Sequence, residues 1–549
     1  MGLVGYFTAE IGLWSELHTY SGGLGVLAGD HVKSAADAEL ELVGVTLLYR
    51  EGYGRQHIDS KGNQTESFAA IDPAEHLIDT GLVLTLPLDD TTLHAKIWQV
   101  EVVGVTGHIV PVYFLDTHHP NNSEYHRSMG ARLYGGNDDV RIRQEFLLGV
   151  GGVRLLNLLK KKFTGLHLNE GHCTFALLEL LNQGWTRAEL SKNILFTTHT
   201  PVPAGHDRFN WADVNDVLGD LMPKDAIELV KSVGDPENGA RCSMSHLAVA
   251  LADQVNAVSN LNAQVASTMF DNYHIHPLTN GVHHITWTSP TMAELYDEKL
   301  PGWREDPTQL GYAGTLSDED LLAASSRNRK NVHDLVKAST GVELAEQRLT
   351  IGFARRFATY KRANLVFKDL ERLSKIGGGK IQFVFSGKAH PRDEGGKQLI
   401  RDIYGSAKNL EEKIPVAFLE NYDMDTGLAM TSGVDIWLNN PIRPMEASGT
   451  SGMKAAMNGV PNCSILDGWW PEGCQHGVNG WAIGESDDER DDERDAENIY
   501  SVLEELVIPT WEKGGTVWAN IMRSSIATSA RFTGARMISE YKRFYDAFE

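Results

Sequence analysis

A glycine- and serine-rich turn that leads into a lysine is the segment of this sequence with the clearest chemical potential. Residues 444–454 run Pro-Met-Glu-Ala-Ser-Gly-Thr-Ser-Gly-Met-Lys. Backbone N–H groups at such a turn, and at the start of a following helix, can cradle a phosphate. The spacing fits neither a Walker A loop nor a dinucleotide-binding Gly-x-Gly-x-x-Gly loop. Lys454 therefore needs a role other than holding a nucleotide.

Basic and amide side chains follow several apolar runs that we predict to be strands. In open parallel sheets ligands bind where the strands end, so these loops are the expected site. Arg and Lys side chains bind phosphate, and Asn, Glu and His side chains bind hydroxyls, so we predict a ligand that combines phosphate and sugar. The alternative is that Arg355, Arg356 and Lys361 are charges at the surface start of a helix. The loops are Ala354–Arg362, Ser386–Pro391, Glu420–Tyr422, Asn439–Pro441, Asn169–His172 and Thr197–Pro201.

Short apolar runs alternate with helical patterns along the second half, which indicates βαβ units and a parallel sheet covered on both faces. The pattern predicts a helix over Arg362–Ile376, and in the first half a helix that starts at Cys173–Leu181. The predicted strands are Leu349–Phe353, Ile381–Phe385, Pro415–Leu419, Val434–Leu438 and Asn462–Leu466, with Asn193–Phe196 and Gln254–Val258 in the first half.

The fold class predicted from this pattern is α/β, with two Rossmann-like domains. The join falls near Thr279–Gly281, which divides the chain into residues 1–281 and 282–549. A helical stretch around Arg536–Phe548 is expected to pack back on the N-terminal domain.

Composition excludes several classes of protein. The 549 residues are 42% hydrophobic and 22% charged, as in ordinary globular proteins. A net charge of -23 argues against general nucleic-acid binding, which needs clustered Lys and Arg. No basic segment precedes an apolar signal core, and no apolar run is long enough for a membrane helix. Four scattered cysteines indicate a reducing cytoplasm rather than a disulfide scaffold.

Residues Glu446–Lys454 resemble the coenzyme-attachment motif of the glycogen and starch phosphorylases. The resemblance implies that Lys454 carries pyridoxal 5′-phosphate. Thr450, Ser451 and Arg355 would hold its phosphate, although the family usually has a lysine in place of Arg355. Tyr422 and Trp287 would belong to the coenzyme pocket. The residues that would face the hydroxyls of the reacting glucose are Glu446, Ser448 and Gly449.

Further blocks match the same family in the same order. Arg356 and Lys361 resemble its phosphate-binding residues, and Tyr360 resembles a residue that contacts the sugar. The other matching positions, expected at the glucose and phosphate sites, are His199, His172, Asn280, Gly22 and Gly23. Asp423 departs from the pattern, because the family often has arginine there. The chain starts close to the first matching block, so we expect a short form without the N-terminal regulatory extension.

The resemblance implies a GT-B-type architecture with two domains facing a central cleft. The expected enzyme transfers the non-reducing-end glucose of an α-1,4-glucan to orthophosphate with retention, giving glucose 1-phosphate. The 5′-phosphate of the coenzyme would act as a proton relay. The residues expected to carry the chemistry are Lys454, Arg356, Lys361, His199 and Glu446. We expect no nucleic-acid, membrane or metal partner, and a homo-oligomer is compatible with the sequence.

Two other functions remain open from the sequence. A nucleotide-sugar glycosyltransferase such as glycogen synthase shares the predicted architecture and a Gly-Gly-Leu-Gly loop, but it needs no lysine at position 454. A glucan-binding scaffold without chemistry is disfavoured by the presence of Lys454, Arg356 and Lys361 together.

Several conspicuous residues have plain structural interpretations. Met453 and Met457 fit core packing, and the acidic run Glu485–Asp495 fits a solvated surface loop or a helix start. Trp469 and Trp470 could stack on a sugar or fill a domain interface. His172 and His206 could contact hydroxyls or be structural. Four further histidines lack the spacing of a metal site: His274, His276, His283 and His284.

Overall fold

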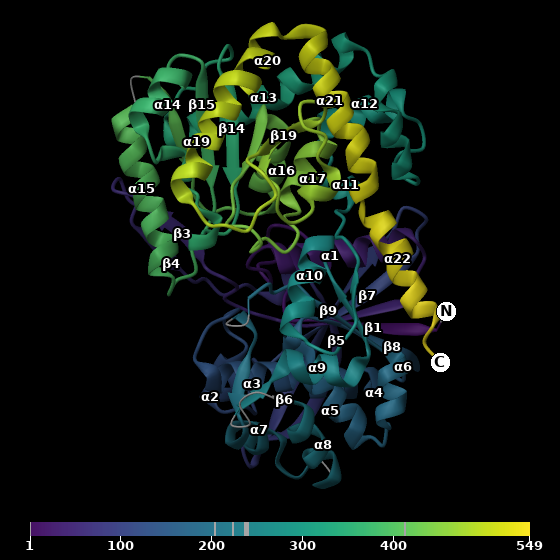
Figure 1. Ribbon diagram of the computed structural model, residues 1–549. Coiled ribbons are helices and arrows are strands. Elements are labelled where there is room, and N and C mark those ends of the chain that lie inside the picture. The colour runs from purple at the N-terminus through teal and green to yellow at the C-terminus, as the bar shows by residue number, and fades with distance from the viewer. Residues whose placement is uncertain (1, 203–204, 222–223, 235–240, 411–412) are drawn as a thin grey trace. The chain divides into compact units, whose positions relative to one another are not determined.

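The computed structural model describes residues 2–202, 205–221, 224–234, 241–410 and 413–549 (Figure 1). The chain forms two compact units. The first contains residues 1–54, 68–279 and 535–549, and the second contains residues 55–67 and 280–534. The boundary at 279/280 lies two residues from the join expected at 281/282. Residues 55–67, which the sequence division assigned to the N-terminal domain, lie in the second unit.

The first unit is built on a mixed nine-stranded sheet of order β13-β12-β9-β8-β1-β2-β7-β6-β5. The strands from β13 to β7 pair in parallel, and β6 and β5 continue the sheet as antiparallel neighbours. The strand order changes direction between β8 and β1. The bounds are β1 Leu3–Thr8, β2 Leu42–Leu47, β5 Ile78–Leu88, β6 Thr91–Val103, β7 Ile109–Asp116, β8 Phe163–Asn169, β9 Ile194–Thr198, β12 Gln254–Ala257 and β13 Ile275–Pro277.

Helices cover this sheet, and side-chain caps define many of their starts. Helix α6, for example, begins with a capping box in which Thr186 and Glu189 bond each other's backbone N–H groups. A small ribbon of β10 (Arg208–Asn210) and β11 (Arg241–Ser243) lies outside the sheet. The helices are α1 Gly23–Asp37, α2 Glu124–Met129, α3 Asp138–Phe146, α4 Gly152–Leu158, α5 Phe175–Asn182, α6 Arg187–Asn193, α7 Trp211–Leu218, α8 Lys224–Gly234, α9 Met244–Ala252, α10 Asn260–Met269 and α22 Gly534–Asp546.

The second unit is a doubly wound parallel sheet of order β16-β15-β14-β17-β18-β19. Numbered from β14, this is the 3-2-1-4-5-6 order of a Rossmann fold, so the strand order reverses between β14 and β17. The six strands are β14 Leu349–Ala354, β15 Ile381–Ser386, β16 Val416–Leu419, β17 Ile436–Asn439, β18 Asn462–Ile465 and β19 Gly480–Ile483.

The helices of the second unit include a 23-residue helix, α13, which has an N-cap at Ser317 and a left-handed glycine C-cap at Gly341. The helices are α11 His284–Trp287, α12 Pro290–Lys299, α13 Asp318–Thr340, α14 Leu370–Gly377, α15 Glu394–Leu410, α16 Met424–Gly433, α17 Ser451–Met457, α18 Trp470–Gly473, α19 Asp492–Val502, α20 Ile508–Lys513 and α21 Gly515–Ser529.

The predicted α/β class with parallel sheets is confirmed, whereas a cleft between two domains stays a prediction. All seven predicted strands coincide with observed strands to within two residues at each end. The helix predicted over Arg362–Ile376 is wrong in its first half. Arg362 has a left-handed φ of 49°, and α14 begins only at Leu370. A non-glycine residue in that region cannot continue a right-handed helix.

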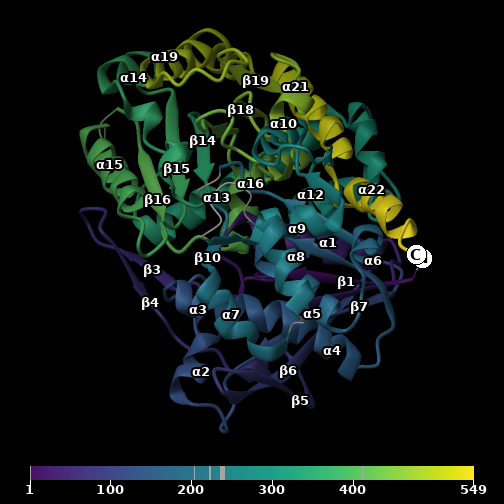
Figure 2. The same cartoon turned by 60° about the horizontal axis from the view of Figure 1, so that its bottom comes forward.

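A hairpin from the N-terminal part of the chain docks on the second unit. It consists of β3 (Arg55–Ile58) and β4 (Gln64–Ser67) and lies beside α15 in Figure 2. The buried amides of Gln56 and Gln64 donate to the carbonyls of Gly387 (2.8 Å) and Ala389 (2.9 Å). The hairpin therefore supports the loop that follows β15.

The C-terminal helix α22 packs within the first unit, and the two chain ends lie side by side (Figures 1 and 2). The Tyr545 hydroxyl lies 2.7 Å from His167 Nδ1 and 3.0 Å from His31 Nε2. His167 Nε2 lies 2.7 Å from the Thr197 hydroxyl, which donates to Asn256 (2.6 Å). Thr197 must then accept from His167, which accepts from Tyr545, which accepts from His31.

This chain of donors needs a neutral ring at His167, whereas His31 donates through Nε2 in either protonation state. A second proton on His167 would place an N–H group against the O–H of Tyr545. Burial lowers the pKa of His31 to about 3 and the pKa of His167 well below its ordinary value.

Among the described residues, no helix is long and apolar enough to span a membrane.

Acid should destabilise the first unit through these histidines. The pKa of His31 is lowered in the folded state. Below about pH 6.5 His31 therefore binds a proton in the unfolded chain but stays unprotonated in the folded chain. The free energy of unfolding then decreases as the pH falls. The unfolding free energy of wild type should decrease from pH 7.5 to pH 5.5. In His31→Gln, which lacks the titrating ring, we expect this decrease to be smaller by about 1 kcal/mol. Urea unfolding of both proteins at both pH values measures this, and parallel pH profiles would contradict it.

Candidate active site

The candidate site of the second unit lies where the strand order reverses. Arg355 directly follows β14, and Asn439 ends β17. The guanidinium of Arg355 donates to Asn439 Oδ1 and to Glu446 Oε2. Lys361 Nζ donates to both carboxylate oxygens of Glu446, each at 2.8 Å. Two cations from the loop after β14 thus meet one carboxylate from the loop after β17.

These groups are buried, and their charges determine their protonation. Lys361 and Glu446 are only 7% and 6% exposed. Burial alone would raise the pKa of Glu446, but the charges of Arg355 and Lys361 outweigh it and lower this pKa to about 2. Glu446 is therefore a carboxylate at neutral pH, and it cannot serve as a proton donor.

A second buried carboxyl, Asp467, supports Glu446 from the loop after β18. Its oxygens accept the N–H groups of Glu446 (2.9 Å) and Gly468 (2.8 Å). Burial and the charge of Glu446 raise the pKa of Asp467 to about 7. At Gly468, with a φ of 59°, a Cβ atom would lie 2.3 Å from the Ser448 carbonyl oxygen, so the close approach of these loops requires glycine.

Lys454 lies in α17 with its amine 3.5 Å from the centroid of the Trp287 ring. Asn458 ties the two residues together, since its amide donates to the carbonyls of Trp287 (2.6 Å) and Lys454 (2.9 Å). Met453 and Met457 beside the lysine are fully buried, which confirms their packing role.

The small residues before Lys454 have distinct environments. Gly449 has a left-handed φ of 79°. Ser448 is buried, and its hydroxyl has no hydrogen-bond partner among the described residues. Thr450 precedes α17 as its N-cap, and Ser451 accepts a hydrogen bond from Trp437 Nε1 at 3.1 Å. The Ser448 hydroxyl is therefore available to a ligand.

Tyr422, Asp423 and Lys388 come from neighbouring strand-end loops. Burial raises the pKa of Tyr422 to about 12, with the charge of Arg355 opposing it. Burial lowers the pKa of Lys388 to about 8. Asp423, which replaces the arginine usual in the resembled family, is the N-cap of α16 and accepts from Thr426 N–H at 2.8 Å.

The remaining predicted residues of the second unit differ in burial and contacts. Arg356 is exposed, and Tyr360 is half-buried with its ring centroid 4.5 Å from Lys361 Nζ. Asn280 is buried at the first position of the long segment of this unit. Trp469 and Trp470 are each 1% exposed, and Trp469 packs on Phe532 with ring centroids 4.6 Å apart. These tryptophans fill the interior of the unit and present no face to a sugar.

The first unit carries its own polar cluster where β1 and β8 meet. Glu10 follows β1 and accepts from Ser21 N–H (2.6 Å) and the Tyr134 hydroxyl (2.8 Å). Gly22 is the N-cap of α1, which begins at Gly23. At Gly25 a Cβ atom would lie 2.7 Å from Glu10 Oε2, so the glycine-rich turn packs directly on this carboxylate.

His199 follows β9 and is held by groups that follow β8. Its ring Nε2 donates to Asn169 Oδ1 at 2.7 Å, and its backbone N–H donates to Glu170 at 2.8 Å. Burial lowers the pKa of His199 to about 4. Glu170 also accepts from Thr200 N–H at 3.1 Å. His199 is thus a neutral ring in a fixed orientation.

His172 and His206 contact protein groups on either side of Glu170. His172 Nε2 lies 3.3 Å from Asp207, which also pairs with Arg141 at 2.5 Å. His206 bonds Ser245 (2.8 Å) and the Thr200 carbonyl (3.1 Å). A hollow beside His172 is lined by Tyr134, Arg141 and Glu145, with Ala9, Leu47, Tyr49, Gln144 and Leu148.

Among the predicted residues, Arg355 and Glu446 meet at the strand-order reversal of the second unit. The second unit brings together Arg355, Lys361 and Glu446, and separately Lys454 and Trp287. Gly22, Gly23, His172 and His199 belong to the first unit. The sequence did not single out Glu10, Tyr134 and Asp467, and it gave Arg362 no role beyond its place in the loop after β14. Position after an apolar run could have revealed Glu10 and Asp467, because each follows a strand by two residues.

The buried groups of the second unit fit an aldehyde-bearing phosphate ester such as pyridoxal phosphate. Lys454 offers a buried amine on an aromatic face. Arg355 Nε and the Ser448 hydroxyl are buried donors with no hydrogen-bond partner among the described residues. An unmet cationic donor and an unmet hydroxyl, both buried in the same unit, suit a phosphate and a hydroxylated ligand.

The two α/β units, with buried cations where the strands of the second unit end, have the architecture of an α/β enzyme. A family model described as carbohydrate phosphorylase matches residues 207–472. Maltodextrin phosphorylase of Thermococcus litoralis is 40% identical over 98% of this chain and 70% of that protein. The glycogen phosphorylases of Mycobacterium tuberculosis and Aquifex aeolicus are each 36% identical, over 99% and 98% of this chain and 70% and 85% of theirs.

The chain belongs to the carbohydrate phosphorylase family. The resemblance inferred from the sequence is confirmed, and the nucleotide-sugar glycosyltransferase alternative is wrong.

Removal of the charge of Glu446 should destabilise the second unit and increase the stabilisation that bound anions give it. In Glu446→Gln, Arg355 and Lys361 lose their buried counter-charge, which typically costs about 3–5 kcal/mol. We expect a lower melting temperature in phosphate-free buffer, and a larger rise on adding orthophosphate than in wild type, because binding to the folded state stabilises it. Thermal melts with and without orthophosphate measure both effects.

Glu512→Gln is the matched control, because Glu512 pairs with Lys380 at the exposed surface. An equal phosphate-induced rise in Glu446→Gln and wild type would contradict the expectation.

Proposed function

We propose that the protein is an α-1,4-glucan phosphorylase that transfers the non-reducing-end glucose to orthophosphate and releases glucose 1-phosphate. The observation that carries the proposal is the buried cluster of Lys361, Arg355 and Glu446 at the strand-order reversal. Glu446 lies in the segment that leads into α17 and Lys454. The related proteins named maltodextrin and glycogen phosphorylase support a glucan as the substrate.

The protonation of the site favours phosphorolysis over hydrolysis. A glycoside hydrolase needs a carboxylic acid that still holds its proton at neutral pH. Glu446 is ionised because its pKa is about 2. Asp467, with a pKa raised to about 7, does hold a proton near neutral pH, but its two oxygens accept the backbone N–H groups of Glu446 and Gly468, so it supports the loop rather than a substrate. The proton for the leaving oxygen is then best supplied by the orthophosphate that Lys361 and Arg356 bind.

In this mechanism the orthophosphate O–H protonates the glycosidic oxygen as the bond from C1 to that oxygen breaks. An oxygen of the same phosphate then bonds C1 on the face that the glucan leaves, so the α configuration is retained. Pyridoxal phosphate, when bound at Lys454, supplies a phosphate with a second pKa near 6 that can exchange a proton near neutral pH.

The residues of this chain bind and orient the reactants. Thr450, Ser451 and Arg355 would hold the coenzyme phosphate, with Tyr422 and Trp287 in the same pocket. Ser448, Gly449, Asn280 and Tyr360 would contact the glucose. From the first unit, Gly22 and Gly23 would lie over the phosphate, and His172 and His199 would contact the sugar.

Glu446 would link the two ligands. An orthophosphate at Lys361 competes with Glu446 for the same ammonium, because an ammonium has three donors that it must divide among its acceptors. Release of one carboxylate oxygen from Lys361 frees it to accept a glucose hydroxyl. Phosphate binding would therefore prepare Glu446 to hold the sugar.

The coenzyme lysine gives the most direct test. Purified wild type should absorb near-ultraviolet light through its coenzyme and form glucose 1-phosphate from maltodextrin and orthophosphate. Lys454→Ala should lose the absorbance and at least about 10³-fold of the activity, as is typical when a group essential to chemistry is removed.

Lys380→Ala is the control, because Lys380 is half-exposed and its ion-pair partner within the described residues is Glu512. Coenzyme-free wild type that forms glucose 1-phosphate, or an unaffected Lys454→Ala, would overturn the proposed mechanism.

A further inference from the structure

The acidic segment beyond β19 is not simply a solvated surface. Residues 485–491 are exposed, but Asp492 and Asp495 at the start of α19 both bind one buried arginine. Arg362 Nη1 lies 2.9 Å from Asp492 and 2.7 Å from Asp495. The side chain of Arg362 is only 5% exposed. The exposed loop and the helix start agree with the sequence expectation for this run, and the helix start also supplies the counter-charge that a buried guanidinium needs.

Arg362 joins the two loops that carry the candidate site. It directly follows Lys361, and its guanidinium donates to the carbonyls of Asn440 (3.1 Å) and Pro441 (2.7 Å). The side-chain amide of Asn440 returns a bond to the Arg362 carbonyl at 2.8 Å. Both the side chain and the backbone carbonyl of Arg362 therefore join the loop after β14 to the loop after β17.

The same loops are joined again next to the lysine. Ile442 N–H donates to the Tyr360 carbonyl at 2.8 Å, so backbone contacts lie on each side of Lys361. Arg362 keeps its left-handed φ of 49°, a strained conformation for a residue with a side chain. Such a conformation persists only where surrounding contacts hold it, and the guanidinium provides four of them.

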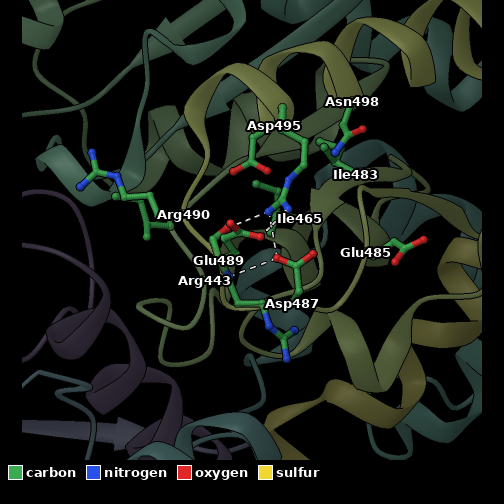
Figure 3. A pocket seen from close by; sticks show the side chains of 11 residues that line it. Arg443, Ile465, Ile483, Glu485, Asp487, Glu489, Arg490, Asp495 and Asn498 are labelled. Carbon is green, nitrogen blue, oxygen red and sulfur yellow. Dashed lines mark hydrogen bonds and ion pairs between the residues drawn. The ribbon is translucent and has the colours of Figure 1, made fainter.

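A second arginine makes a similar connection nearer Glu446. Arg443 Nε lies 2.7 Å from Asp488, and its guanidinium also donates to the Leu466 carbonyl. Leu466 precedes Asp467, which holds the backbone of Glu446. Figure 3 shows Arg443, Asp487 and Asp495 around the hollow in this region, with Ile465 and Ile483 on its wall. Asp488 is 62% exposed, so this contact is the weaker of the two.

We propose that Asp492 and Asp495 are positioning residues of the phosphate site. Together with Arg362 they form what we term the acidic clamp, which fixes Lys361 opposite Glu446 from outside the catalytic centre. This inference rests on the proposed function for its effect on catalysis, but the clamp itself is a property of the loops. Neither aspartate touches a reactant.

The charge-neutral variant Asp492→Asn/Asp495→Asn tests the clamp in the full-length holoenzyme. Loss of charge-assisted bonds to Arg362 should loosen Lys361, so the KM for orthophosphate rises by about tenfold while the KM for maltodextrin changes by less than about twofold. Asp495→Glu, which keeps the charge, should restore most of the orthophosphate affinity when Asp492 is intact.

Glu493→Gln is the matched control. Glu493 lies in the same first turn of α19 and pairs with Lys368 at 3.0 Å, but it contacts neither site loop. It therefore reproduces the loss of one charge at the helix start without touching Arg362. Equal changes in both KM values, or the same change in Glu493→Gln, would overturn the positioning role.

Hydrogen–deuterium exchange separates this inference from the proposed function. Amides in peptides 356–363 and 439–446 should exchange faster in Asp492→Asn/Asp495→Asn than in wild type and Glu493→Gln. Unchanged exchange there overturns the clamp whatever the activity. Faster exchange supports the clamp, and if wild type then forms no glucose 1-phosphate, only the proposed function fails.

Discussion

The carboxylate of Glu446, held between Lys361 and Arg355, is the interaction on which the second unit depends. Three buried charges in one place are tolerable only if each is paired, because the desolvation of an unpaired charge costs several kcal/mol. The pairing draws together the loops after β14, β17 and β18, since Asp467 holds the backbone of Glu446. The geometry of the sheet supplies the meeting point, and the charges determine which side chains occupy it.

In the first unit, buried carboxylates are stabilised mainly by neutral hydrogen-bond donors rather than by cations. Its carboxylates Glu10 and Glu170 accept mainly backbone and hydroxyl hydrogen bonds, and His199 stays neutral beside Glu170. Neutral rings also connect α22 to the sheet through Tyr545. A sugar is recognised by hydroxyl bonds rather than by charge, so this environment suits a glucan, whereas the cations of the second unit suit a phosphate.

The sequence predicts the parallel strands well because buried strands are continuous apolar runs, which is why β14 and β15 were placed within a residue. It fails at Arg362, because local helix propensity cannot anticipate a guanidinium that forces a left-handed backbone. The hairpin β3–β4 is missed because its strands are short and polar, and its docking depends on Gln56 and Gln64. Lys454 and Glu446 were found by motif, whereas the partnership of Glu446 with both cations requires the fold.

Net charge also constrains the site. At -23 the chain repels anions at long range, but salt screens exposed charges beyond a Debye length of about 8 Å at physiological ionic strength. A phosphate therefore responds chiefly to the groups within that distance. Buried cations are screened far less than exposed ones, so a few buried Lys and Arg residues outweigh many distant surface carboxylates. Because Lys361 and Arg355 are buried, they can attract a phosphate even though the protein has a large negative net charge. Burial also means that these cations need counter-charges at fixed positions.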